Sequence, residues 1–169
     1  MKQNSILYRH GTSADKAQLM NLALIAYQSL SKDLTAENWT LLKNNLSKPK
    51  LMDELLENGH CFVCESNNEL VGMAFILRSG LKSELFLEEW SCIRMVGVNP
   101  EYRGNGIAKN LTSMCIAFAK QNNERVIALH TGEHMADARH VYEKFGFTIY
   151  KEIEPLFGKR YFIYTLDLS

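Results

Sequence analysis

Apolar positions recur along the chain with two periods, and the period of each segment predicts its secondary structure. In several segments the apolar residues lie three or four positions apart, which places them on one face of a helix. This spacing predicts helices at about residues 12–30, 35–47, 107–121 and 138–145, with a further short turn or helix at 51–57. Pro49 separates the second helix from that short segment, because proline disrupts a helix interior.

Short apolar segments bounded by turn residues predict strands between these helices. They lie at about residues 6–9, 62–65, 70–77, 90–98, 126–130, 147–153 and 160–168. A polar turn at residues 66–69 joins the second and third strands as a hairpin, and the charged residues 82–89 form a connection or a strand extension. The order β-α-α-β-β-β-α-β-α-β-β predicts a mixed α/β fold in a single domain of residues 1–169, since no repeat or linker divides the sequence.

The most distinctive stretch follows the strand predicted at residues 90–98, where a proline turn leads into a glycine-rich loop and the long helix. The loop reads Arg103-Gly104-Asn105-Gly106-Ile107-Ala108. The first N–H groups of a helix have no intrahelical partners and lie at the positive end of its dipole. Gly104 and Gly106 lack a Cβ, so the backbone can approach a bulky anion closely. The stretch therefore predicts a cradle for a phosphate or pyrophosphate.

Two common phosphate-binding patterns do not fit this loop. A P-loop needs Gly-Lys-Ser/Thr at fixed spacing, and a dinucleotide-binding fingerprint needs a third glycine where this chain has Lys109. The loop instead matches the Arg/Gln-x-x-Gly-x-Gly/Ala signature of the GCN5-related N-acetyltransferase (GNAT) family, which residues 94–102 also resemble. A second stretch resembles the Ala-x-x-Leu-Tyr-x-x-x-Gly-Phe segment of that family and reads Ala138-Arg139-His140-Val141-Tyr142-Glu143-Lys144-Phe145-Gly146-Phe147.

The resemblance covers about residues 5–168 and implies the acyl-CoA N-acyltransferase fold, a mixed, mostly antiparallel sheet with splayed central strands flanked by helices. It also implies an enzyme that moves the acetyl group of acetyl-CoA directly to a primary amine of a small molecule or peptide. Residues 103–108 would hold the pyrophosphate of acetyl-CoA, mainly through backbone N–H groups. Val96 and Val98 would pair with the pantetheine arm as an added strand does, and the Val96 N–H would polarise the thioester carbonyl.

The resemblance makes Tyr142 the catalytic candidate, as the general acid that protonates the departing CoA thiolate. A phenol can donate a proton or a strong hydrogen bond to a sulfur whose thiol has a pKa of about 8.5. Tyr142 also lies on the apolar face of its predicted helix, so a core tyrosine with a bonded hydroxyl is the alternative.

Glu89 is the candidate for the proton acceptor, because it lies just before the fourth strand on the expected substrate side. A lysine-like amine has a pKa of about 10.4, so its proton must be taken up before or during attack. Further candidates nearby are Glu88, Glu133, His130 and His134. The chain has Cys92 where many members of the family carry a glutamate, and Met135 where an asparagine is frequent. These departures leave the proton acceptor and one cofactor contact open.

The composition, 46% hydrophobic and 22% charged residues, is typical of a soluble globular domain. The 19 basic and 19 acidic residues balance, and no basic stripe carries interleaved aromatics, so neither nucleic acid nor a membrane is expected as a partner. Residues 1–4 lack the apolar stretch of a signal peptide, and a cytoplasmic protein is expected. Cys61 and Cys64 would project to opposite faces of a strand, so neither a disulfide nor a metal is expected to join them.

The acceptor amine is the least determined part of the prediction. Residues 27–58 and 80–91 carry acidic side chains that could attract a cationic amine, but no motif selects among a polyamine, an aminoglycoside, an amino acid and a peptide. A transferase for longer acyl groups or for protein N-termini is the alternative on the same fold. A non-catalytic acyl-CoA-binding regulator is the alternative from another class, and strand or helix edges could support a homodimer.

Overall fold

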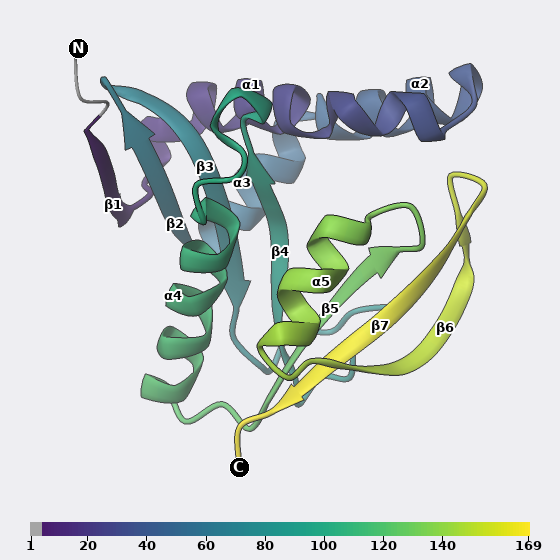
Figure 1. Cartoon of the computed structure of the whole chain (residues 1–169). Coiled ribbons are helices and arrows are strands. Elements are labelled where there is room, and N and C mark those ends of the chain that lie inside the picture. Colours follow the sequence, from purple (N-terminus) through teal and green to yellow (C-terminus); the bar gives the residue numbers. More distant parts are fainter. Residues whose placement is uncertain (1–4) are drawn as a thin grey trace.

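The computed structural model describes residues 5–169, so residues 1–4, on which the expectation about a signal peptide depends, lie outside it. Within this part of the chain seven strands form one sheet in the order β1-β2-β3-β4-β5-β7-β6 (Figure 1). All neighbouring strands are antiparallel except β4 and β5, which are parallel. The strands are β1 (Ile6–His10), β2 (Gly59–Ser66), β3 (Glu69–Leu77), β4 (Ser91–Val98), β5 (Val126–Gly132), β6 (Thr148–Leu156) and β7 (Lys159–Asp167). The predicted mixed, mostly antiparallel sheet is confirmed.

The α-helices of the described chain cover both faces of this sheet. They are α1 (Lys16–Tyr27), α2 (Ala36–Leu46), α3 (Pro49–Asn58), α4 (Ile107–Gln121) and α5 (Ala136–Lys144). α1 and α3 pack on one face, and α4 and α5 pack on the other (Figure 1). Strand β2 shows why both faces are apolar, because Cys61 and Val63 belong to the cluster under α1 and α3, whereas Phe62 and Cys64 belong to the cluster under α4.

Two segments differ in detail from the predicted elements. The apolar spacing predicts one helix as far as Leu30, but α1 ends at Tyr27 and the chain continues as a 3₁₀ helix over Gln28–Asp33. Apolar residues three positions apart fit either kind of helix, so the sequence does not separate them. The short helix predicted at residues 51–57 begins earlier, at Pro49, because the first helical position needs no N–H. Residues 82–89 form a connection without strand pairing, which is one of the two predicted alternatives for this segment.

Strands β4 and β5 separate soon after they meet, and this opening positions the site. In the described chain they pair only at Ser91↔Ile127 and Cys92↔Ala128. Farther along β4, Met95 has a φ of +54°, and the pairing of β3 with β4 shifts register between Met73 and Phe75. These features mark a β-bulge. Beyond Cys92, the edge of β4 that faces β5 therefore has no strand partner among residues 5–169.

The cysteines lie as the alternation of strand residues predicts. Cys61 and Cys64 belong to clusters on opposite faces of the sheet, and all four cysteines are free thiols. No group of three or more potential ligands within residues 5–169 is placed to hold a metal ion. Among those residues, no helix has both the length and the apolar character needed to cross a membrane.

Candidate active site

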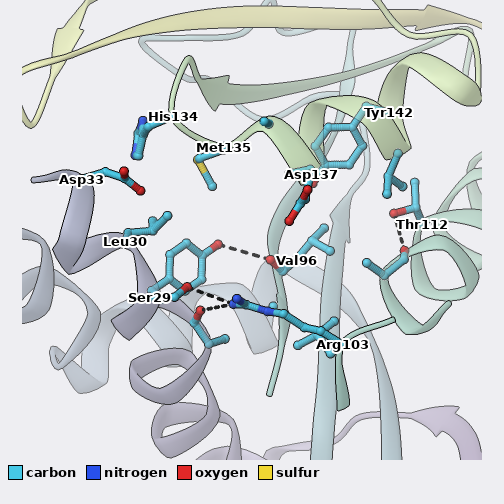
Figure 2. Close-up of a pocket in the computed structure, with 18 of the residues that line it drawn as sticks. Ser29, Leu30, Asp33, Val96, Arg103, Thr112, His134, Met135, Asp137 and Tyr142 are labelled. Carbon is cyan, nitrogen blue, oxygen red and sulfur yellow. Dashed lines mark hydrogen bonds between the residues drawn. The ribbon is translucent and has the colours of Figure 1, made fainter. Parts of the chain in front are cut away.

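A pocket of about 250 Å³ lies beside the separated part of β4. Its walls come from the end of α1 and the following 3₁₀ helix, from the second half of β4, from the start of α4 and from α5 (Figure 2). The predicted site residues that line it are Val96, Val98, Arg103, Ala108 and Tyr142. The structure thus brings together residues from the two stretches singled out in the sequence.

The loop before α4 presents a row of unpaired backbone donors. Within the described chain, the N–H groups of residues 104–109 donate to no other group of the protein. Gly104 and Gly106 have φ values of +82° and +73°, which L side chains rarely adopt, and a Cβ on either would meet nothing within 4 Å. The donors therefore lie at the open, positive end of the α4 dipole, as in sites for phosphate groups.

The side chain of Arg103 links this loop to α1. Its Nη2 donates to the carbonyl of Ala26 and to the hydroxyl of Ser29, each at 3.0 Å (Figure 2). Ala26 lies in the last turn of α1, where helix carbonyls favour a cation, and Ser29 lies in the 3₁₀ helix that follows. The backbone of the loop, rather than the Arg103 guanidinium, is thus left free for an anion.

Close packing brings Tyr27 to the edge of β4. A Cβ added at Gly97 would lie 3.0 Å from the Cβ of Ala26, which is tighter than nearly all real Cβ contacts, so glycine favours the close approach of α1 to the strand. The Tyr27 hydroxyl donates a long hydrogen bond of 3.5 Å to the Val96 carbonyl (Figure 2). Burial raises the pKa of Tyr27 to about 12, so this phenol stays protonated at neutral pH. The sequence predicts only an apolar-face position for Tyr27, because the contact depends on tertiary packing.

Tyr142 belongs to the core and also lines the pocket. Its side chain is 7% exposed and packs edge-to-face against Phe147, with ring centroids 5.9 Å apart. The hydroxyl makes no hydrogen bond to another group within residues 5–169, and the ring lines the pocket (Figure 2). Burial raises the pKa of Tyr142 well above the usual value for a phenol. A core tyrosine with a bonded hydroxyl is therefore not what the structure contains.

His134 and Asp33 face each other across the other end of the pocket (Figure 2). Both ring nitrogens of His134 are buried and have no hydrogen-bond partner among the described residues. Loss of hydration lowers the pKa of His134 below its usual 6.5, while the negative charge of Asp33 opposes that shift. Buried polar atoms are normally bonded, so the two unpartnered nitrogens of His134 are unusual among the residues that line the pocket.

Glu89 lies away from this pocket. It is exposed in the connection between β3 and β4, where it lines a separate hollow together with Glu88. Five strand steps, about 16 Å, separate the start of β4 at Ser91 from Val96. The structure does not bring Glu89 together with Tyr142, and its role as proton acceptor stays a prediction.

His130 and Glu133, two of the other candidates for proton transfer, are held in structural contacts. His130 lies between Phe86 and Tyr161, at centroid distances of 6.0 and 5.9 Å, and burial lowers its pKa to about 4. The Glu133 carboxylate accepts a hydrogen bond of 3.2 Å from the Arg160 N–H. Burial raises the pKa of Cys92 to about 11, so its thiol stays protonated at neutral pH.

Comparison with known proteins identifies acetyltransferases as the proteins that this chain resembles. A family model described as the acetyltransferase (GNAT) family matches residues 18–147. An uncharacterized N-acetyltransferase of Methanocaldococcus jannaschii is 31% identical over 86 residues, which make up 51% of this chain. The match covers 38% of that protein, so the chain spans little more than a third of the length of this relative.

Solved structures share the arrangement of the whole chain. The PaiA N-acetyltransferase of Thermoplasma acidophilum in complex with coenzyme A has a TM-score of 0.77 at 17% identity, over 96% of this chain and 99% of that one. The putative acetyltransferase yncA of Salmonella typhimurium with acetyl-CoA has a TM-score of 0.70 at 19% identity, over 98% of this chain and 95% of that one. A ribosomal-protein-alanine N-acetyltransferase of Brucella melitensis has a TM-score of 0.72 at 22% identity, over 96% and 99%. At these identities the likeness shows the fold alone.

Proposed function

The chain belongs to the acetyltransferase (GNAT) family, and on this premise we propose that it transfers the acetyl group of acetyl-CoA directly to a primary amine. The observation that carries the proposal is the row of unpaired N–H groups at residues 104–109 beside the open edge of β4. Such donors fit a pyrophosphate, and an open strand edge fits an extended arm that contains amides. Acetyl-CoA contains both parts.

Each residue then has a role that its position supports. Residues 103–108 hold the pyrophosphate, and the backbone of Val96 and Val98 pairs with the pantetheine arm. The Val96 N–H donates to the thioester carbonyl and stabilises the negative charge that forms on its oxygen during attack. Tyr142 donates a proton to the sulfur as the C–S bond breaks. Residues 1–169 act as one catalytic domain.

We assign removal of the amine proton to His134. As the C–N bond forms, the amine nitrogen becomes positively charged and acidic. His134 lines the pocket with unpartnered ring nitrogens, and its lowered pKa keeps the imidazole neutral at pH 7. A neutral imidazole has one nitrogen that can accept a proton, here directly or through water.

Replacing His134 by Gln is expected to lower kcat/KM at pH 7 by about a hundredfold, the lower end of the range for general acid–base catalysis. In the wild type, kcat/KM should fall as the pH drops through the lowered pKa of His134, because the protonated ring cannot accept a proton. This decline should be absent from the pH profile of His134→Gln. Glu89→Gln serves as the comparison and should retain the wild-type profile. If Glu89→Gln rather than His134→Gln removes the decline, Glu89 is the acceptor.

A thermal-shift titration of the purified protein with acetyl-CoA tests the proposed function. At a hundredfold excess over Kd, a ligand of the folded state stabilises by about 2.7 kcal/mol. For a chain of this size the midpoint should rise by about 5–11 °C. NADH, which also carries a pyrophosphate, should leave the midpoint unchanged.

Detection of free thiol with a panel of amines completes this test. Release of CoA that depends on both acetyl-CoA and an amine identifies a transferase. A thermal shift with acetyl-CoA but no thiol release for any amine would instead favour a non-catalytic acyl-CoA-binding domain. No shift with acetyl-CoA would remove the roles of the loop and of Tyr142 together.

A further inference from the structure

Strand β4 passes from the acetyl-CoA pocket into a second cavity of about 300 Å³. Val96 and Val98 line the first pocket, whereas Cys92 and Arg94 line the second. The other walls of this cavity come from the end of α3, the end of β3 and residues 78–90. They combine apolar residues with polar ones, among them the cations Arg78 and Lys82. The bulge at Met95 separates the two sets of residues.

Arg94 is a half-buried cation without a partner. Its guanidinium makes no hydrogen bond and no ion pair within residues 5–169. Among the described residues that line this cavity, Glu54 is the one with an acidic side chain. Its Oε1 lies 3.6 Å from the Nζ of Lys50 and is not paired with Arg94. Withdrawing a charge from water without pairing it costs free energy, and arginines in such places normally contact a carboxylate or a phosphate.

The position of Arg94 places this cation next to the expected point of acetyl transfer. Cys92 and Ala128 are the last paired residues of β4 and β5, and Arg94 and His130 follow two positions later on the same face. There the strands have separated, and Arg94 lies only two residues before Val96. Its charge joins burial in lowering the pKa of His130 to about 4, which indicates that the two side chains lie near each other.

We propose that Arg94 binds a carboxylate of the acceptor, so that the substrate is an amine that also carries a carboxylate and an apolar substituent. The guanidinium presents paired donors that match a carboxylate, and the apolar substituent occupies the cavity beside Leu55, Leu77 and Phe86. This inference rests on the proposed transfer of an acetyl group to an amine. It selects apolar amino acids among the acceptors that the sequence leaves open.

Matched pairs of amines test the assignment through kcat/KM. L-phenylalanine is compared with phenethylamine, and L-leucine with 3-methylbutylamine, because each pair differs only in the carboxylate. The wild type should prefer the carboxylate-bearing member of each pair. Arg94→Gln should lower kcat/KM for the two amino acids by about 30-fold, the effect of losing a hydrogen-bonded charge pair, and should change the plain amines by less than about twofold.

Arg125→Gln is the matched control, because Arg125 is an exposed arginine outside both cavities. This variant should leave all four values of kcat/KM unchanged. Arg94→Gln should unfold at the same or a higher temperature than the wild type, because it removes an unpaired charge. Loss of activity toward the amino acids alone, in a stably folded variant, therefore reports on recognition of the carboxylate.

Two results would overturn the assignment while leaving the proposed function intact. One is transfer to plain amines with no preference for a carboxylate, and the other is a preference that persists in Arg94→Gln. Calorimetric titration with N-acetyl-L-phenylalanine, without CoA, measures binding of the carboxylate at this cavity independently of acetyl transfer. Binding that Arg94→Gln weakens about 30-fold supports the assignment even if the acetyl donor is different, and no binding to the wild type contradicts it.

Discussion

Replacing Tyr142 by Phe is expected to lower kcat by about a hundredfold while the affinity for acetyl-CoA stays near the wild-type value. Loss of a general acid typically costs two to four orders of magnitude, about 10²–10⁴-fold. The ring would keep its contact with Phe147 and its place in the core, because only the hydroxyl is removed. That hydroxyl bonds to no other group of the described chain, so the fold should lose little stability.

The pH dependence of kcat in the wild type is a second test of the role of Tyr142. An acid catalyst works in its protonated form, and burial raises the pKa of Tyr142 above the ordinary value of 10.0. Ionisation of Tyr142 should therefore cause no decline of kcat between neutral pH and pH 10 or so. A free phenol would already be half ionised at about pH 10.

Tyr8→Phe is the matched control for this experiment. Tyr8 lies on β1, and its hydroxyl accepts a hydrogen bond of 3.0 Å from the amide of Asn110, away from the pocket. The kcat of the Tyr8→Phe variant should equal that of the wild type. If Tyr142→Phe also retains full kcat at every pH, Tyr142 is a packing residue and another group protonates the sulfur.

The parts of the fold that local patterns determine could be predicted from the sequence. Helical and strand periods locate nearly every element, and the glycines of the loop at residues 103–108 mark positive φ values before the structure is known. The alternation of strand residues also places Cys61 and Cys64 on opposite faces. Each of these features depends on residues within a few positions of one another.

The residues that complete the site could not be read from the sequence, because packing between distant segments places them. Tyr27 reaches Val96 only because α1 lies against Gly97. Arg94 lies at the opening because β4 parts from β5 two residues earlier, and no local pattern marks that point. The same geometry explains the position of Glu89, which is near in sequence to β4 but lies at the far end of the strand from the pocket.

Replacing Gly106 by Val is expected to weaken acetyl-CoA binding by about a hundredfold. Gly106 caps α4 with a φ of +73°, and the N–H groups of residues 107–109 that follow it have no partner within the described chain. A β-branched residue is strained at positive φ and should rotate the loop backbone toward negative values, which turns those donors away from the anion. Loss of one or two charge-assisted hydrogen bonds, each worth about 1.5–3 kcal/mol, gives an effect of this size.

Gly80→Val separates this effect from backbone strain alone. Gly80 also has a positive φ, +101°, with nothing within 4 Å of an added Cβ, but it lies in the connection after β3 and outside the pocket beside β4. Both variants should therefore lose about 1–2 kcal/mol of stability, the cost of a left-handed residue with a side chain. Calorimetric titration with acetyl-CoA should show weaker binding only for Gly106→Val. Equal affinity in both variants and the wild type would show that the pyrophosphate binds somewhere other than this loop.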